Sequence, residues 1–458
     1  MSTTPVHEDP SIRVHVAELG ARPIESAVLC EIDRNLKFST ESLESYFFAE
    51  WKEEAYDALL LAAAVEFADK SRRRSSIDWR RSIALHVPVH DVERWQQTAV
   101  SDALTDALDH LTGDSWDITF YGRKHRASKP RQSSLDLPAS VEAVLPFSNG
   151  LDSRAVGGLM ERTLGSRLIR VRLASRLQDN EALKGRRLAF TNVPYRVVGH
   201  SAESSARSRG FKFAMISGIA AYLSGANTII VPESGQGALG PSLVPVGQSY
   251  EDYRSHPTFT RRMERLFRGL FEKEIAFSFP RLWHTKGETL RLFIEECGDH
   301  LWTATRSCWQ QSRQVGVGGR RRQCGICAAC MLRRMSVHAA GGSEPEDQYV
   351  WERLDVSALE DGVASGFSRT RITKAMREYA LAGALHLDHL AALRRKPANT
   401  APLNVFSHQI GQTLDLDRLS VRAKLDRLLE QHAREWAAFV SSLGSGSFVR
   451  TWAVEVHS

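Results

Sequence analysis

The chain has 458 residues, of which 42% are apolar and 25% are charged. These proportions are typical of a folded protein and exclude a wholly disordered chain. The length predicts about two to four domains. The net charge is only +6, which is weak support for nucleic-acid binding. The sequence contains no run of roughly 18 uninterrupted apolar residues and no secretory signal, so we expect a cytoplasmic protein without a membrane span.

The first region, residues 1–138, mixes strand and helix patterns and is predicted to form an α+β extension. Runs rich in Val, Ile and Leu indicate strands, and apolar residues three and four apart indicate helices. A basic stretch that contains Ser and Pro, residues 123–137, has the composition of a linker. The predicted elements, in chain order, are 26–32, 53–69, 82–89, 91–111 and 116–121.

The second region, residues 139–345, alternates strands with helices, which predicts an α/β core with a mostly parallel sheet covered on both faces. The third region, residues 346–458, is predicted to be helical at 372–394 and 419–443. Its helices would form a cap on the sheet or the surface of a homodimer. The elements predicted in the second region are strands at 141–147, 167–174, 195–198 and 228–231 and helices at 152–163, 206–223, 264–272 and 286–297.

A small-residue turn joins the first strand of the second region to its first helix. Such a turn lets backbone N–H groups approach a ligand, and the helix N-terminus adds unpaired donors and a positive dipole end. The turn is therefore suited to binding a pyrophosphate group, and Asp152 would cap the helix or orient Mg²⁺. The alternative is an ordinary capped helix after a strand. The residues of this turn are Ser148, Asn149, Gly150, Leu151, Asp152 and Ser153.

Four of the six cysteines are gathered in one short stretch, whereas Cys30 and Cys297 stand apart. In a large chain without an export signal, this clustering favours a metal site over disulfides. Four thiolates suit a closed tetrahedral Zn²⁺ site, and an iron–sulfur cluster is the alternative. The predicted metal ligands are Cys308, Cys324, Cys327 and Cys330.

The turn resembles the Ser-Gly-Gly-x-Asp-Ser PP-loop of N-type ATP pyrophosphatases, with Asn149 and Arg154 as departures. Residues 285–288, 305–308 and 324–333 resemble the later motifs of the 7-cyano-7-deazaguanine synthases. In that family a Thr-Lys-x-Glu segment, a Ser-Cys pair and a Cys-Gly-x-Cys-x-x-Cys-x-x-Arg segment follow the PP-loop. The resemblance covers roughly residues 141–340 and implies the adenine-nucleotide α-hydrolase-like fold.

The resemblance implies an ATP-dependent enzyme that adenylates 7-carboxy-7-deazaguanine and forms an amide and then a nitrile. It implies ATP and Mg²⁺ at the turn, a structural Zn²⁺, and catalytic roles for Asp152, Lys286 and Arg209. Glu233 and His256 lie in segments where the family's substrate-facing stretch is replaced, and we expect them to line the base pocket.

Other features resemble the long QatC-type proteins of bacterial anti-phage systems, namely 87–89, Trp95, 113–116, 232–233 and 256–257. This resemblance implies a defence role beside partner proteins encoded nearby, with an amine of such a partner as the acceptor in place of ammonia. A non-catalytic nucleotide or deazaguanine sensor with a degenerate PP-loop is the alternative. A tRNA-thiolating enzyme is disfavoured because the clustered cysteines are assigned to the metal, so nucleic acid is not expected as the direct substrate.

Overall fold

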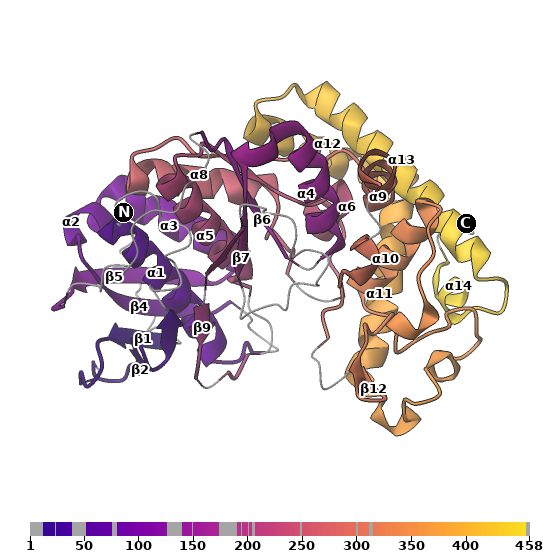
Figure 1. Ribbon diagram of the computed structural model, residues 1–458, viewed down its shortest axis with the longest axis horizontal. Coiled ribbons are helices and arrows are strands. Elements are labelled where there is room, and N and C mark those ends of the chain that lie inside the picture. The colour runs from indigo at the N-terminus through magenta and orange to yellow at the C-terminus, as the bar shows by residue number, and fades with distance from the viewer. Residues whose placement is uncertain are drawn as a thin grey trace, which may run out of the picture. The chain divides into compact units, whose positions relative to one another are not determined.

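The computed structural model of the protein divides into two compact units that interleave along the chain (Figure 1). The first unit comprises 1–146, 164–231 and 258–278, and the second comprises 147–163, 232–257 and 279–458. The three predicted regions are continuous in sequence and these two units are not, so the region boundaries stay predictions. The structure describes residues 12–22, 24–38, 52–75, 80–125, 140–148, 150–173, 190–193, 195–199, 201–203, 207–247, 250–298, 301–310 and 315–454.

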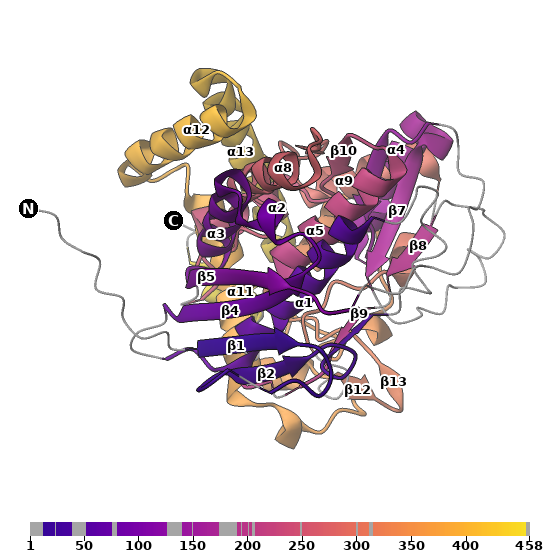
Figure 2. The same ribbon diagram turned by 90° about the vertical axis from the view of Figure 1, so that its left-hand side faces the viewer.

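A four-stranded sheet in the first unit has the order β2-β1-β4-β5 and is parallel throughout (Figure 2). Parallel neighbours need crossover connections, which α1 (Glu53–Ser71) and α3 (Thr98–Thr112) supply before β4 and before β5. The α+β prediction for this region is therefore wrong, because α1 and α3 return the chain so that β4 and β5 run in the same direction as β1 and β2. The strands are β1 (Ile12–Ala17), β2 (Val28–Glu31), β4 (Ser82–Val89) and β5 (Ser115–Gly122), with the short helix α2 (Val92–Gln96) between β4 and α3.

A second parallel sheet of the same unit has the order β11-β10-β6-β7-β8. Helix α5 (Arg209–Ser224) packs on this sheet and also against α1, where Lys212 Nζ lies 2.7 Å from the buried carboxylate of Glu66. The parallel α/β prediction is confirmed at this level. The remaining elements of the unit are β3 (Leu36–Phe38), β6 (Ala143–Pro146), β7 (Leu168–Leu173), β8 (Phe190–Val193), β9 (Tyr195–Val197), β10 (Thr228–Ile230), α8 (Pro257–Phe271) and β11 (Ala276–Ser278).

A buried charge network ties together the C-terminal end of α1 and the starts of β4 and β5. The guanidinium of Arg81 lies 2.6 Å from Asp69 and 2.5 Å from Asp114, and Arg74 contacts both carboxylates as well. Both aspartates are fully enclosed. Buried charges are tolerated only when they are paired and hydrogen-bonded, so each member of this network depends on the others.

The second unit is mainly helical, which confirms the prediction of a helical C-terminal region. One of its apolar cores is formed by buried side chains from within 315–335 and 350–453, and it joins the cysteine-rich segment to the C-terminal helices. A smaller core lies under α4 and α9 and includes Leu151, Phe293 and Trp302. The elements are α4 (Leu151–Leu164), α6 (Gly235–Ala238), α7 (Gly240–Leu243), α9 (Lys286–Cys297), β12 (Gly316–Val317), β13 (Arg320–Arg321), α10 (Ala328–Ala339), α11 (Lys374–Ala392), α12 (Thr400–Leu414), α13 (Arg418–Ser442) and α14 (Phe448–Trp452).

Within the described part of the chain, every helix is too short or too polar to cross a membrane.

Candidate phosphate and metal sites

The predicted phosphate turn leads into α4, whose first residue, Leu151, is fully buried. Ser148 Oγ accepts a hydrogen bond from the Gly150 N–H at 3.1 Å and lies 2.9 Å from Ser153 Oγ. The two hydroxyl groups therefore meet across the turn at the start of the helix. Asn149 lies outside the described residues.

Arg154 and Gly150 each have a defined environment at this turn. The guanidinium of Arg154 lies 5.4 Å from the ring centroid of Phe147, so it stacks on an aromatic ring. A Cβ atom at Gly150 would lie 3.0 Å from Ser148 Oγ and 3.8 Å from the Arg306 carbonyl oxygen. The turn is thus closely backed by the segment that carries Cys308.

Asp152 and Lys286 form an ion pair that joins the first turn of α4 to the first turn of α9. Asp152 Oδ2 lies 2.5 Å from Lys286 Nζ, and both side chains are largely buried. The other carboxylate oxygen, Asp152 Oδ1, is enclosed and has no hydrogen-bond partner among the described residues. A buried carboxylate oxygen without a partner is costly, so it is a natural ligand for a cation or a hydrogen-bond donor.

Lys286 is the first residue of α9 because the sequence around it forms a capping box. Thr285 Oγ1 accepts a hydrogen bond from the Glu288 N–H at 3.1 Å, and Glu288 Oε2 accepts one from the Thr285 N–H at 2.8 Å. The Thr-Lys-x-Glu pattern therefore has a local structural cause. It places the ammonium group of Lys286 beside Asp152.

Two residues without a predicted site role, Gln236 and His432, support the backbone of Lys286. Its N–H donates to Gln236 Oε1 at 2.7 Å, and Gln236 Nε2 lies 2.7 Å from His432 Nδ1. His432 Nε2 in turn lies 2.8 Å from the Leu387 carbonyl oxygen. Burial lowers the pKa of His432 to about 4, so its ring is neutral. Because a carbonyl only accepts, Nε2 carries the proton and Nδ1 accepts from Gln236.

A buried glutamate lies behind the N-terminus of α9. Glu435 Oε1 accepts hydrogen bonds from Thr285 Oγ1 at 2.5 Å and from Gln431 Nε2 at 3.1 Å. Burial raises the pKa of Glu435 to about 7, against the opposing effect of these two hydrogen bonds. A Cβ atom at Gly287 would lie 3.0 Å from the same oxygen, so this helix start leaves no space for a side chain there.

Glu233 shares the electrostatic environment of the ion pair. Burial of its carboxyl group, followed by the negative charge of Asp152, raises the pKa of Glu233 to about 8, while Lys286 and Arg254 oppose this effect. Arg254 Nε donates to Asp252 Oδ1 at 2.9 Å. Glu233 is therefore mostly protonated at neutral pH and can donate as well as accept a hydrogen bond.

The other two predicted site residues have different surroundings. His256 is buried, with its ring edge-on to Tyr253 at 5.3 Å and to Phe406 at 5.7 Å. Arg209 belongs to the first unit, where it is exposed at the start of α5 and its guanidinium lies 5.4 Å from the Phe213 ring centroid. Their predicted roles stay predictions.

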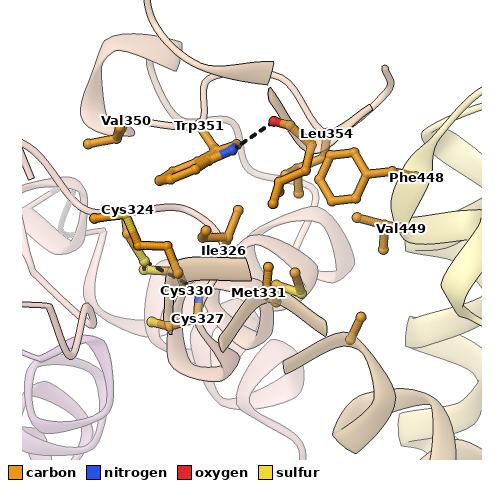
Figure 3. Packing of buried hydrophobic residues seen from close by; sticks show 14 of the residues in the cluster. Cys324, Ile326, Cys327, Cys330, Met331, Val350, Trp351, Leu354, Phe448 and Val449 are labelled. Carbon is orange, nitrogen blue, oxygen red and sulfur yellow. Dashed lines mark hydrogen bonds between the residues drawn. The ribbon is translucent and has the colours of Figure 1, made fainter. Parts of the chain in front are cut away.

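The four clustered cysteines form a candidate metal centre. Their sulfur atoms all lie within 4.8 Å of one another, and Cys324 Sγ lies 3.7 Å from Cys330 Sγ. A tetrahedral site with Zn–S bonds of about 2.3 Å has sulfur–sulfur edges of about 3.8 Å. The set can therefore hold a metal such as Zn²⁺. Figure 3 shows Cys324, Cys327 and Cys330 on one side of Ile326 and Trp351.

The backbone around the cysteines is built for a sulfur-bound metal. The Cys324 and Cys327 N–H groups donate to the sulfur atoms of Cys308 and Cys324, at 3.1 and 3.3 Å. Gly325 has φ +90°, and a Cβ atom there would lie 2.8 Å from the Trp351 carbonyl oxygen. Only glycine fits this turn without strain.

The pKa values of the clustered thiols are shifted in opposite directions. Hydrogen bonds from the thiols of Cys324, Cys327 and Cys330 hold the pKa of Cys308 well below its usual range, whereas burial raises the pKa of Cys324 and Cys330. A bound cation would replace those protons and satisfy all four sulfurs.

The metal segment is paired with the chain that follows it. The Gln323 N–H donates to the Gln348 carbonyl at 2.8 Å, and the Trp351 N–H donates to the Cys324 carbonyl at 3.0 Å. Arg333, which is fully buried, forms an ion pair with Glu344 at 2.7 Å. These contacts fix the metal segment from its C-terminal side.

Comparison with known proteins gives no family assignment: no protein-family model matches the sequence, and no curated protein does.

Proposed function

We propose that this protein is an ATP-dependent carbon–nitrogen ligase that activates the carboxylate of a 7-deazaguanine and joins it to an amine. The observation that carries the proposal is the Asp152–Lys286 pair at the start of α4, in which Asp152 Oδ1 is enclosed and has no hydrogen-bond partner among the described residues. The Lys286 ammonium group lies beside an anion-binding helix start, and a carboxylate oxygen that could still accept a ligand lies next to it. This arrangement suits a nucleotide that arrives with a divalent ion. The resemblance of the surrounding motifs supplies the substrate class.

In the first step, an oxygen of the substrate carboxylate attacks the α-phosphorus of ATP. A bond forms between that oxygen and phosphorus, and the bond to the β-phosphate oxygen breaks, so pyrophosphate leaves. Ser148, Ser153 and the N–H groups at the start of α4 would bind the departing pyrophosphate, and Lys286 would neutralise part of its charge.

Asp152 would hold the Mg²⁺ that accompanies ATP, and this ion would supply further charge neutralisation at the phosphates. Its Oδ1 atom, for which the described part of the chain offers no hydrogen-bond donor, fits that role, since Mg²⁺ prefers carboxylate oxygen. Glu233, which is mostly protonated at neutral pH, would bind a polar edge of the base. The four-cysteine centre would be structural, because four protein ligands leave no open position.

In the second step, an amine nitrogen attacks the acyl carbon of the adenylate, AMP leaves with the carboxyl oxygen, and the amine loses a proton to solvent. The acceptor is ammonia in an ordinary synthase, where a second activation yields the nitrile. We infer that here an amine on a partner protein of a bacterial anti-phage system replaces ammonia, because the substrate-facing stretch differs from that of the synthases and the chain carries added regions at both ends.

The test incubates the full-length protein with ATP, Mg²⁺, 7-carboxy-7-deazaguanine and the proteins encoded beside it. Pyrophosphate release and an added deazaguanine mass on a partner are the expected results. Asp152→Asn, which keeps the shape but removes the charge, should abolish release, whereas Arg162→Ala, an exposed change on the same helix, should not. Binding of ATP without pyrophosphate release would favour a non-catalytic sensor, and nitrile formation without protein modification would indicate an ordinary synthase.

A further inference from the structure

Helix α13 contacts the start of α9 and the neighbouring Gln236 through three side chains. Arg427 lies 2.8 Å from Glu288, His432 bonds to Gln236, and Glu435 accepts from Thr285. Two of these contacts are with the capping box of α9, and the third is with Gln236, which accepts a hydrogen bond from the Lys286 N–H. The third predicted region therefore supplies a second layer behind the predicted phosphate site.

We propose that His432 is a positioning residue for Lys286, acting through Gln236. This inference rests on the proposed function, in which Lys286 neutralises the departing pyrophosphate. A continuous chain of hydrogen bonds runs from the Leu387 carbonyl through His432 and Gln236 to the Lys286 N–H.

The donor and acceptor order along this series of hydrogen bonds fixes the orientation of the His432 ring and of the Gln236 amide. Because Leu387 offers a carbonyl, His432 must donate from Nε2, and Nδ1 then accepts from the Gln236 amide. The Gln236 carbonyl is thereby turned toward Lys286. A neutral histidine is required, and burial of His432 keeps it neutral.

Loss of the Nδ1 acceptor would leave the Gln236 amide free to turn and would release the first residue of α9. Lys286 would then no longer be held at 2.5 Å from Asp152. Small displacements of a charged group at a reacting centre lower rates by up to about 100-fold. We therefore expect an effect on turnover that exceeds the general effect of losing a buried histidine.

The experiment compares three variants of the full-length protein. His432→Leu removes the acceptor, His432→Asn keeps an acceptor oxygen near the Nδ1 position, and His386→Leu is the matched control. His386 is also buried and neutral, but it bonds to the Val244 carbonyl, and no contact with Gln236 or Lys286 is seen in the described structure.

Two readouts separate this inference from the proposed function. The first is kcat and KM for ATP in pyrophosphate release: His432→Leu should lower kcat by roughly 10- to 100-fold with little change in KM, and His432→Asn should restore most of it. The second needs no turnover: the rate at which N-hydroxysuccinimidyl acetate acylates Lys286, followed by mass spectrometry, should rise in His432→Leu and stay unchanged in His386→Leu.

Equal losses of kcat in His432→Leu and His386→Leu, or no gain in Lys286 acylation in His432→Leu, would overturn the inference. If the unaltered protein releases no pyrophosphate, the proposed function fails by itself. The acylation rates then decide separately whether His432 positions Lys286.

Discussion

Replacing Glu435 with Gln should change how the stability of the protein depends on pH. Burial raises the pKa of Glu435 to about 7, from an ordinary value of 4.5. Between these two values the folded protein keeps the proton and the unfolded chain loses it. The free energy of unfolding therefore falls as pH rises through this window and is level above about pH 7.

The size of the effect follows from the burial of the group, which is 4% exposed. A pKa about 2.5 above the ordinary value corresponds to about 3 kcal/mol, at about 1.4 kcal/mol for each pH unit. Part of this loss has already occurred at about pH 5, since the unfolded carboxyl is mostly ionised there. Glu288 and Arg291 also act on Glu435, in opposite directions.

The assay is urea denaturation followed by far-UV circular dichroism at about pH 5 and about pH 8. Relative to Glu435→Gln, the unaltered protein should lose about 2–3 kcal/mol of stability between the two conditions. Glu430→Gln, a change at a half-exposed, ion-paired glutamate of the same helix, controls for the loss of a charge. Parallel curves for the unaltered protein and Glu435→Gln would refute the assignment of a raised pKa to this glutamate.

Three further predictions concern other parts of the molecule. Atomic absorption should find about one zinc per chain, and Cys308→Ser should lower that content and the Tm, because the four-sulfur set loses one ligand. Arg81→Ala should cost about 3–5 kcal/mol in urea denaturation, since it leaves two buried carboxylates short of a partner, whereas the exposed Arg80→Ala should cost little. Gly158→Ala should lower stability by about 1–3 kcal/mol, because its Cβ atom would lie 2.3 Å from the Phe293 ring; an unchanged Tm would contradict that packing.

Periodicity predicted most of the long helices and the buried strands. The helix predicted at 53–69 is α1, and the strand predicted at 82–89 has the bounds of β4. It missed β1, β8 and β11, which are six residues or shorter, and it missed α12 entirely. Short strands give too few residues for a clear alternation, so their pairing in the sheet decides their structure.

Periodicity also could not predict the relative direction of the strands in the first sheet. Strand runs at 26–32 and 82–89 look the same whether they pair parallel or antiparallel. The helix between them decides the direction, and the structure shows that β1 pairs in parallel with both neighbours.

The site was predicted where its residues are close in sequence. The cysteine set and the turn before α4 are short motifs, and Lys286 was found from a motif that proves to be a capping box. His432 and Glu435 gave no such signal. Gln236 and His432 are 196 positions apart, and a single sequence contains no mark of a pairing at that distance.

The backbone pairing of 323–324 with 348–351 limits how this protein could be rearranged by gene fusion or truncation. The metal segment takes its hydrogen bonds from residues just beyond the predicted core, and Trp351 is fully buried beside Ile326. A chain that ended at residue 345 would expose that ladder as an unpaired edge. The C-terminal region is therefore not a detachable module, because its removal would leave the metal segment without these hydrogen bonds.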